Sequence, residues 1–340
     1  MKVAVVFGGS SEERDVSIAS GLEVISGLRA GGHEVIAVDT AKGVLTSEAE
    51  RSLAGFNVLE KPPESNALVE AGNRSPVAVL GAPELNDVDV VFIALHGGSG
   101  EDGTFQALLE AWKIPFTGAG HIGSAIAMDK DVSKRLMVSV GVPTPAWQMC
   151  SRGEERITNA LGFPVIVKPN SQGSTIGLTL VRVPEALPSA IANAAQFGHE
   201  IMLEAYVGGR EFTVGILDGA ALAVGEIVAP SEIFDYESKY QRGGAKEVFP
   251  ADISAAESQE IQELGARVHK VLKLSGYSRV DFRRDDAGKL WCLEANNVPG
   301  LTPTSLLPQS AKAVEIEFSE LCERICELGI GRSRDEKLDR

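Results

Sequence analysis

The pattern of apolar residues changes at Pro143-Thr-Pro145, and this change constrains the fold more than any other feature of the chain. Before it, continuous apolar runs at 2–7 and 88–95 alternate with helical stretches, as parallel strands buried on both faces do. After it, apolar runs pair across short glycine-containing turns, which is typical of antiparallel hairpins. We therefore predict an α/β protein that begins with a doubly wound parallel domain and continues with mixed α+β structure.

The same patterns place the individual elements and the domain boundaries. We expect helices over about 11–30, 104–112, 184–196 and 254–274, and strands over 2–7, 33–39, 88–95, 114–117, 163–169, 174–181, 200–206, 211–218, 278–284 and 289–296. Residues 41–86 contain Pro62-Pro63 and many small polar residues, so we expect a variable insertion there. The chain divides near 118 and near 200, which gives domains 1–118, 119–200 and 201–340.

Charge and cysteine content argue against several function classes. Lys+Arg 32 against Asp+Glu 47 gives a net charge of −15 over 340 residues. Such a surface repels phosphate backbones and anionic lipid, so nucleic acid and membranes are not expected partners. The four cysteines form no CxxC pair, which argues against a zinc site and fits a reducing compartment. The N-terminus reads as a strand rather than a signal peptide, and no apolar run approaches the ~18 residues of a membrane span, so we expect a cytoplasmic location.

Two glycine patterns could bind a dinucleotide. Gly98-x-Gly100-x-x-Gly103 and Gly118-x-Gly120-x-x-Gly123 each follow an expected strand and precede an expected helix. Neither is followed about 20 residues later by the acidic residue that binds a ribose hydroxyl. An NAD(P)-dependent oxidoreductase therefore stays open only as a remote alternative. A Walker A motif is absent as well, so an ATP site would need another phosphate-binding loop.

The expected hairpin over 163–181 offers such a loop. Lys168 lies near the end of its first strand, and the turn at 171–177 is rich in Ser, Thr and Gly. Small residues let backbone N–H groups close over phosphate oxygens, and a lysine adds positive charge. A plain flexible hairpin without a ligand explains the same residues equally well.

The hairpin at 278–296 carries one polar face. With a loop of two or four residues, that face presents Arg279, Asp281, Glu294 and Asn296. Two carboxylates and an amide oxygen suit Mg²⁺, which prefers hard oxygen ligands. The opposite face presents the side chains that would pack inward, Val280, Phe282, Leu293 and Ala295. A solvated polar face is the alternative, and an odd loop length would break the register.

Two loops are well placed to bind a substrate. The Pro- and Gly-containing segment 296–306 follows the second strand of that hairpin directly. The segment from His96 to Gly103 lies at the carboxyl end of an expected parallel strand, where open α/β sheets bind ligands. We therefore expect the substrate near these two segments.

Together these segments resemble the D-alanine–D-alanine ligase family of the ATP-grasp superfamily. The matching pieces occur in family order and leave only about 41–86 unmatched: GGSSEERDVSIASG (8–21), FIALHGGSGEDGTFQALLE (92–110), FTGAG (116–120), MDKDVSKRLM (128–137), VIVKPNSQGSTIG (165–177), LEAYVGGREFTVGIL (203–217), FDYESKY (234–240) and RVD…LEANNVPGLTPTSLLP (279–308). The resemblance implies a Rossmann-like N-terminal domain followed by central and C-terminal ATP-grasp domains, with ATP between the last two. It also implies ATP-dependent condensation of two D-alanines through D-alanyl phosphate, for peptidoglycan precursor synthesis.

The resemblance assigns the nucleotide and metal ligands residue by residue. The lysines that contact the ATP phosphates match Lys130 and Lys168. The contacts to adenine and ribose match Glu204, Val207 and Glu211. The ligands of two Mg²⁺ (or Mn²⁺) ions match Asp281, Glu294 and Asn296, in agreement with the polar face of the hairpin.

The resemblance also assigns the substrate and catalytic groups. The carboxylate that holds the first D-alanine ammonium matches Glu13, for which a capping box with Ser10 is the alternative. Other substrate contacts match His96, Lys239, Ser305 and Leu306, and the groups facing the oxyanion match Arg279 and the Gly300 N–H. A hydrogen-bonded triad that joins the three domains matches Glu13, Ser174 and Tyr240. Residues 230–250 then form a lid, with an ordinary surface loop as the alternative.

A few positions depart from the family pattern without removing a catalytic group: Gln172, Phe234, Asn297 and Pro303. A related ligase that uses D-serine or D-lactate as second substrate therefore stays an alternative. Tyr240 favours D-alanine, since relatives that make D-alanyl-D-lactate typically lack this tyrosine. The family also suggests a homodimer.

Overall fold

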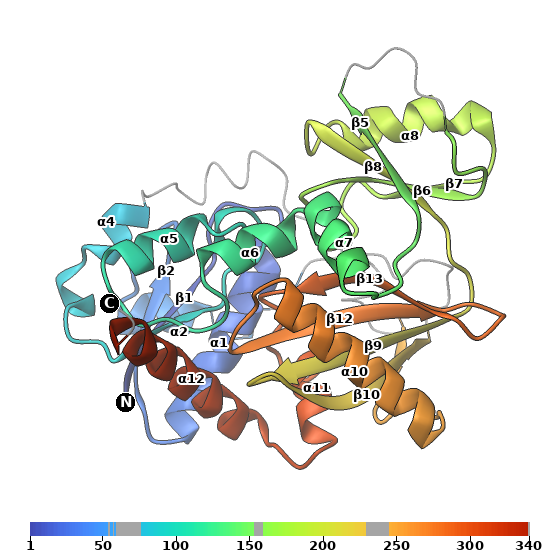
Figure 1. Cartoon of the computed structure of the whole chain (residues 1–340). Helices are drawn as coiled ribbons and strands as arrows, with labels where there is room; N and C mark the ends of the chain where they lie inside the picture. The colour runs from blue at the N-terminus through green and yellow to red at the C-terminus, as the bar shows by residue number, and fades with distance from the viewer. Residues whose placement is uncertain (54, 57, 59–75, 153–158, 229–244, 339–340) are drawn as a thin grey trace.

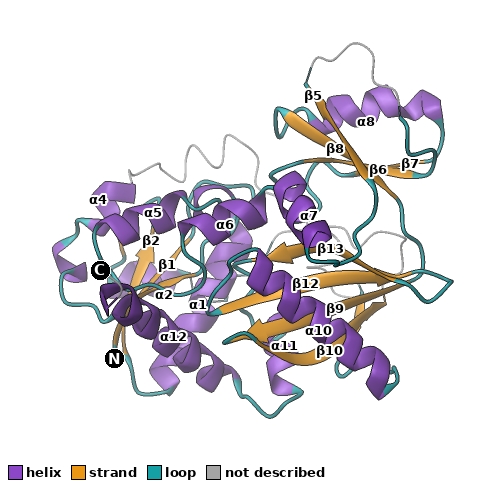
Figure 2. Ribbon diagram, viewed as in Figure 1, coloured by secondary structure: helices purple, strands orange, loops and turns teal. Residues whose placement is uncertain are grey.

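The computed structural model describes the chain except residues 54, 57, 59–75, 153–158, 229–244 and 339–340. Within the described part, three sheets form the centres of three bodies, and helices pack around them (Figures 1 and 2). The order of a mainly parallel sheet followed by two antiparallel sheets agrees with the sequence pattern. None of the described helices is long and apolar enough to cross a bilayer.

The sheet of the N-terminal body has a parallel core, as its buried apolar strands predict. Its order is β3-β2-β1-β4, and its strands are β1 Lys2–Phe7, β2 Glu34–Asp39, β3 Gly43–Val44 and β4 Val90–Ile93. The expected strand over 114–117 is reduced to one bridge between Val91 and Phe116. The ladder stops there because the hydroxyl of Thr117, rather than a backbone carbonyl, accepts the N–H of Ile93 at 3.0 Å.

Helices cover both faces of this sheet. α1 (Arg14–Ala30) packs on one face together with α12 (Phe318–Leu338), so the end of the chain returns to the N-terminal body (Figure 1). α4 (Pro76–Leu80) and α5 (Thr104–Ala111) pack on the other face. The described parts of the expected insertion over 41–86 form β3, α4, a short helix α2 (Ser47–Ser52) and a 3-10 turn at Pro83–Leu85.

The central body has a small antiparallel sheet covered by one helix, α8 (Leu187–Ala194). Its order is β5-β8-β6-β7, and its strands are β5 Trp147–Ser151, β6 Val165–Pro169, β7 Thr179–Val181 and β8 Glu200–Ala205. β6 and β7 form the expected hairpin, but β7 begins late because Ser174, Thr175 and Gly177 have positive φ, which no strand tolerates. β8 pairs with both β5 and β6, so this sheet runs past the expected division at 200 to Ala205.

Two helices that fall within the range 119–200 pack on the C-terminal sheet. α6 (His121–Met128) and α7 (Lys130–Ser139) bury Ala127 and Met137 in the apolar cluster of the C-terminal sheet. α7 begins at a side-chain cap, because the carboxylate of Asp129 accepts the N–H of Val132 at 3.0 Å. The central sheet and its helix α8 are formed by residues 147–205.

The C-terminal sheet has the order β11-β10-β9-β12-β13. Its strands are β9 Arg210–Leu217, β10 Ala220–Val228, β11 Lys246–Val248, β12 Tyr277–Arg284 and β13 Leu290–Asn296. α10 (Ala255–Val271), which starts at a capping box of Ser254 and Glu257, covers one face. α11 (Leu306–Lys312) lies on the other face, where the Ser310 hydroxyl donates to Ala223 O at 2.5 Å.

The hairpin β12–β13 forms its polar face by an unexpected route. Its turn, residues 285–289, has an odd length, which alone would break the register. A β-bulge between Asp281 and Phe282 shifts the pairing back, so that Arg279 lies opposite Asn296 and Asp281 opposite Glu294. The extra residue is Leu293. Its expected inward position is wrong: Cys292 is buried in the core instead, and Leu293 lines a hollow described below.

Candidate functional site

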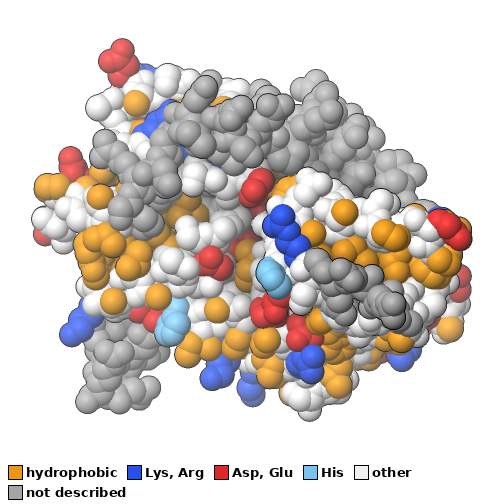
Figure 3. Space-filling model, turned by 90° about the horizontal axis from the view of Figure 1, so that it is seen from above, with side chains coloured by type: hydrophobic (Ala, Val, Ile, Leu, Met, Phe, Trp, Pro, Cys, Tyr) orange, Lys and Arg blue, Asp and Glu red, His pale blue; other side chains and the backbone are white. Residues whose placement is uncertain are grey.

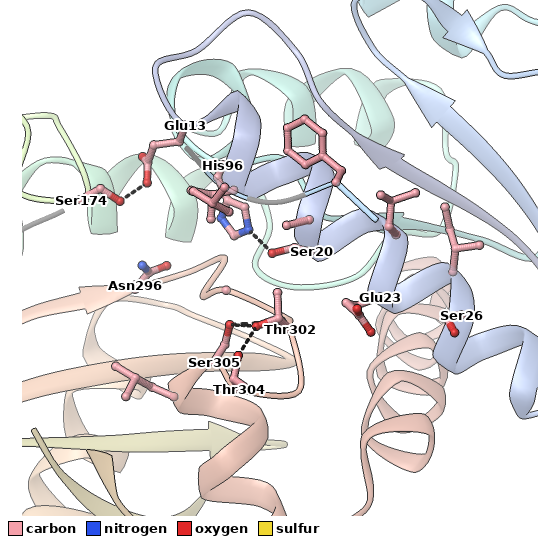
Figure 4. A pocket seen from close by; sticks show the side chains of 18 of the residues that line it. Glu13, Ser20, Glu23, Ser26, His96, Ser174, Asn296, Thr302, Thr304 and Ser305 are labelled. Carbon is pink, nitrogen blue, oxygen red and sulfur yellow. Dashed lines mark hydrogen bonds between the residues drawn. The ribbon is translucent and has the colours of Figure 1, made fainter. Parts of the chain in front are cut away.

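A large cavity of about 840 Å³ lies where the three bodies meet (Figure 4). Its walls come from α1, the loop after β4, the loop at 171–177, the β12–β13 face and the loop at 300–306. A small hollow of about 120 Å³ opens between the central and C-terminal sheets. Gly173, Arg279 and Glu294 line both, so the two spaces share a wall.

The large cavity brings Glu13 and Ser174 together although 161 positions separate them. The Ser174 hydroxyl donates a hydrogen bond to the Glu13 carboxylate, which is 5% exposed (Figure 4). A Cβ at position 173 would come within 2.8 Å of Glu13 Oε2, so any larger residue there would displace this carboxylate. Glu13 makes no side-chain cap at α1, so the capping-box interpretation is wrong. Tyr240, the expected third member, and Lys239 lie outside the described residues.

His96 also faces the large cavity, held by two buried partners. Its Nε2 lies 3.0 Å from Ser20 Oγ (Figure 4). Its Nδ1 lies 3.4 Å from Glu101 Oε1. Ser20 Oγ in turn accepts the N–H of Leu301 at 3.2 Å. A second hydrogen bond joins the same two bodies, because the Asn297 side-chain amide donates to Glu101 O at 3.0 Å. Ser20 was not predicted from the sequence; its place on the inward face of α1 is the signal that could have found it.

The loop expected to bind the second substrate forms the opposite wall. Ser305 Oγ accepts the N–H of Thr302 at 3.1 Å and lies 2.8 Å from the Thr302 hydroxyl (Figure 4). Gly300, Ser305 and Leu306 all line the large cavity with Arg279. A Cβ on Gly300 would lie 3.0 Å from Ser305 Oγ, so glycine lets the two parts of the loop close up. The structure therefore brings together every expected substrate residue that it describes.

The small hollow collects all five residues expected to bind ATP: Lys130, Lys168, Glu204, Val207 and Glu211. Arg283, which was not predicted, anchors two of them. Its Nη2 donates to Glu211 Oε2 at 2.8 Å, and its Nη1 donates to Val207 O at 2.9 Å. Arg283 was recognisable from the sequence, because it continues the alternation of polar residues after Arg279 and Asp281.

A cluster of three buried charges borders this hollow. Glu204 accepts hydrogen bonds from Lys134 Nζ at 2.5 Å and from Lys168 Nζ at 2.7 Å. Burial alone would raise the pKa of Glu204, but the two lysines outweigh it and hold that pKa below its usual value. Burial lowers the pKa of Lys134, whereas Glu204 and Glu294 overcome the burial of Lys168 and raise its pKa.

Lys134 is the second residue that was not predicted. It is 1% exposed and also donates to Thr144 Oγ1 at 2.6 Å. It lies four positions after Lys130 on α7, so both lysines project from the same helix face. This i, i+4 spacing of lysines next to an expected phosphate site was the available signal.

The sequence matches one protein family over most of its length. The family models described as D-ala D-ala ligase N-terminus and C-terminus match residues 2–119 and 136–327. The chain belongs to the D-alanine–D-alanine ligase family. Relatives named D-alanine–D-alanine ligase in Geobacter sulfurreducens and Citrifermentans bemidjiense are 37% and 38% identical over 327 and 325 residues. These alignments cover 95% of this chain and 92% and 94% of the relatives.

The fold of this D-alanine–D-alanine ligase family member agrees with solved structures. It is similar to the crystal structure of D-alanine–D-alanine ligase from Bacillus anthracis complexed with ATP, with a TM-score of 0.77 and 30% identity over 99% of both chains. A second crystal structure of the Bacillus anthracis ligase gives a TM-score of 0.75 and 31% identity. The architecture is the ATP-grasp fold, as the sequence motifs predicted.

The donor atoms expected to bind metal in this family lie together on the β12–β13 face. Asp281 and Glu294 are direct cross-strand partners, and Asn296 lies opposite Arg279. Asn296 Oδ1 accepts the N–H of Val298 at 3.0 Å, which fixes the amide and leaves one lone pair of that oxygen. Among the described residues no group of three or more His, Cys, Asp or Glu forms a metal cluster, because the third donor here is an amide. Two carboxylates and an amide oxygen fit the hard-ligand preference of Mg²⁺.

A lysine and an arginine lie against these two carboxylates. Lys130 Nζ lies 3.6 Å from Glu294 Oε2 and donates to Gln172 O at 2.5 Å. Burial lowers the pKa of Lys130, and the Glu294 carboxylate opposes this effect. The Arg279 guanidinium donates to Asp281 Oδ2 from Nη2 at 2.9 Å and to Oδ1 from Nε at 3.0 Å. The positive charges therefore alternate with the carboxylates along the shared wall.

The two glycine patterns have structural roles in this family member. A Cβ on Gly103 would approach His121 O to 2.5 Å, and one on Gly123 would approach Lys273 O to 2.3 Å. These glycines let the backbone around α6 pack against its neighbours.

Proposed function

We propose that this chain is a D-alanine–D-alanine ligase: it condenses two D-alanines with ATP to give D-alanyl-D-alanine, ADP and phosphate. The observation that carries the proposal is the wall of Gly173, Arg279 and Glu294 shared by the large cavity and the small hollow. A phosphoryl group has to pass from nucleotide to substrate, and such a wall is where the two ligands can meet. The charges on it have the right signs for a phosphoryl group and its metal.

In the first step, the carboxylate of the first D-alanine attacks the γ-phosphorus of ATP and ADP leaves. Glu13, fixed by Ser174, holds the ammonium of that D-alanine, with His96 beside it. Lys130 and Lys168 neutralise charge on the phosphate oxygens. Mg²⁺ bound by Asp281, Glu294 and Asn296 would add further positive charge there; Mn²⁺ has the same ligand preference. The product is D-alanyl phosphate.

In the second step, the amine of the second D-alanine attacks the carbonyl carbon and phosphate leaves. Arg279 and the Gly300 N–H face the oxyanion, and the Ser305–Leu306 segment receives the carboxylate of the second D-alanine. The segment 230–250, most of which lies outside the described residues, is proposed as a lid with Tyr240 and Lys239 at the substrates. A closed lid excludes the water that would hydrolyse the acyl phosphate.

The deciding experiment measures ADP release with ATP, Mg²⁺ and D-alanine, and identifies the product by mass. L-alanine and D-lactate are the controls. D-alanine-dependent ADP release with a dipeptide product is expected. ADP release without the dipeptide contradicts the proposed acceptor, and no release contradicts the ligase reaction.

The second substrate is the finer part of the proposal. Tyr240 favours D-alanine, so we expect D-lactate and D-serine to be used less efficiently at neutral pH. Product mass in competition between equal concentrations of the acceptors measures this preference. Comparable formation of D-alanyl-D-lactate contradicts it.

The setting follows from the proposed reaction. The dipeptide is a precursor for peptidoglycan, so we place the enzyme in cell wall synthesis in the cytoplasm. The four cysteines are free and buried, which fits a reducing compartment. Acidic and basic side chains are interspersed on the face shown in Figure 3, and neither nucleic acid nor membrane is proposed as a partner. We propose three domains divided near 118 and 205, and a homodimer, which sedimentation measures directly.

A further inference from the structure

Glu247 is a carboxylate in the large cavity to which no role has been given. It lies on β11, opposite Ile227 in the ladder with β10, and lines the cavity with Arg279, Ser305 and Leu306. It is partly buried, so its charge loses part of its hydration. A positively charged or hydrogen-bond-donating partner would compensate for this lost hydration.

The contacts of Glu247 place it beside the pocket for the second substrate. The side-chain amide of Gln309 donates to the Glu247 carboxylate and also to Thr304 O, the latter at 2.6 Å. Gln309 therefore ties Glu247 to the loop that ends at Ser305. Glu247 and Arg279, which is proposed to face the oxyanion, line the same cavity, and the charge of Arg279 acts on Glu247.

The other carboxylates of the large cavity are already engaged elsewhere. Glu13 accepts from Ser174, Glu101 lies against His96, and Glu294 belongs to the metal face. Glu50 forms an ion pair with Arg29, and Glu23 lies far along α1. Glu247 is the described carboxylate that borders both the Ser305–Leu306 pocket and Arg279.

The proposed reaction leaves one chemical requirement unmet. The second D-alanine arrives as an ammonium ion at neutral pH, and an ammonium has no lone pair with which to attack a carbonyl. A base must remove one proton first. An amino acid whose carboxylate lies at Ser305–Leu306 occupies the cavity that Glu247 and Arg279 also line.

We propose that Glu247 binds the ammonium of the acceptor D-amino acid and takes its proton. This inference rests on the proposed ligase function. The N–H bond breaks, the Glu247 O–H bond forms, and the freed lone pair attacks the carbonyl carbon of D-alanyl phosphate. The bond from that carbon to the phosphate oxygen then breaks, and the second amine proton leaves on the departing phosphate.

The electrostatics of the site support a proton acceptor. Burial raises the pKa of Glu247, while the Gln309 hydrogen bond and the Arg279 charge act in the opposite direction. The charged group facing it from β12 is Arg279; β10 presents the apolar Ile227, and α11 presents the neutral Gln309. A carboxylate with a raised pKa is a stronger base than an ordinary one.

The test compares Glu247→Gln with a matched control, Glu226→Gln. Glu226 is the next ladder position on β10, on the opposite face, where it pairs with Arg210 outside both cavities. Each variant is assayed with D-alanine alone and with hydroxylamine added. Hydroxylamine is largely unprotonated at neutral pH, so it captures D-alanyl phosphate as the hydroxamate without needing a base.

Glu247→Gln is expected to lower the rate of dipeptide formation by about 10²-fold and to leave hydroxamate formation within about twofold of the parent protein. Glu226→Gln leaves both rates unchanged. A Glu247→Gln variant with a normal dipeptide rate overturns the proposal, and so does one that loses both products equally. A parent protein that forms neither product refutes the ligase function itself, which separates the two failures.

Two further readouts distinguish a base from a structural group. Since Glu247 must be ionised to accept a proton, kcat/KM for the acceptor should fall as pH drops through its raised pKa, and Glu247→Gln should lose this acidic limb. Glu247→Asp keeps a carboxylate and should recover part of the dipeptide rate. An unchanged acidic limb in Glu247→Gln, or no recovery in a folded Glu247→Asp variant, contradicts the proposed role.

Discussion

The two sides of the shared wall are built in different ways. The small hollow is formed mainly by adjacent strands, and its charges are paired before any ligand binds: Glu204 with Lys134 and Lys168, and Glu211 with Arg283. The large cavity is formed mainly by loops and by one face of α1, and its contacts join segments far apart in the chain, as Ser174 to Glu13 and Leu301 to Ser20 do.

The two sides therefore position their functional groups by different means. On the nucleotide side, strand pairing sets positions and each charge stabilises its neighbour, so binding requires little rearrangement. On the substrate side, position depends on how the three bodies dock. Substitutions on the nucleotide side should therefore lower activity by changing the charge around ATP. Substitutions on the substrate side should lower it by moving the groups that contact the substrates.

The largest effect is expected from Glu294→Gln, which removes a charge from the wall common to both sides. Losing one carboxylate of the metal site should reduce turnover by roughly 10³-fold, since metal charge stabilisation is worth about 4 kcal/mol. Turnover as a function of Mg²⁺ concentration measures it, with Asp286→Asn in the exposed turn of the same hairpin as control. Undiminished activity at the parent's Mg²⁺ requirement would remove Glu294 from the metal site.

Arg279→Ala tests whether Arg279, which lines both spaces, stabilises the oxyanion or only pairs with Asp281. Loss of a donor to the oxyanion should lower kcat by about 10²- to 10³-fold. Arg284→Ala, on the same strand but paired with Glu257 outside both cavities, should leave kcat unchanged. A near-normal kcat in Arg279→Ala would show that pairing with Asp281 is its whole function.

On the strand-built side, the polar face of the hairpin was predictable from the sequence, because side chains alternate along strands. The grouping of Arg279, Asp281, Glu294 and Asn296 followed from this alternation. The bulge at Leu293 was not predictable, since it depends on how an odd turn is reconciled with the pairing of buried residues. On the loop-built side, the two substrate loops at 96–103 and 296–306 were predicted from the sequence, but the roles of Glu13, Ser174 and Ser305 followed only from family resemblance. No local pattern states that Ser20 will meet Leu301 across 281 positions.

Lys134→Met tests the paired-charge side directly. Removing this buried lysine leaves Glu204 with Lys168 as its ion-pair partner, and breaking a buried pair costs about 3 kcal/mol of folding free energy. We expect KM for ATP to rise by about tenfold with a smaller change in kcat, which corresponds to about 1.4 kcal/mol of binding.

The control for Lys134→Met is its neighbour. Arg135→Met removes an exposed charge paired with Asp131, so it should change neither denaturant midpoint nor KM for ATP by a measurable amount. Equal effects of the two substitutions would mean that the lysine cluster has no special part in nucleotide binding.

The smallest effect is expected from Ser20→Ala, and it isolates placement from charge. Ser17 and Ser20 are both fully buried on α1, and each makes two hydrogen bonds. Ser17 forms hydrogen bonds with Gly8 and Ala94 in the N-terminal body, whereas Ser20 forms one with His96 and one with Leu301, next to Gly300.

Replacing either serine by alanine leaves a buried polar group without its hydrogen bond and should lower the free energy of unfolding by about 1–2 kcal/mol. Only Ser20→Ala should also lower kcat, by about three- to tenfold, because it releases the loop that carries the Gly300 N–H. Stability from denaturant unfolding and kcat from ADP release, measured on both variants, make the comparison. If the two alanine variants lose kcat equally, the hydrogen bond from Leu301 to Ser20 on α1 does not position the Gly300 N–H. The difference drawn between the two sides of the wall would then not hold for this loop.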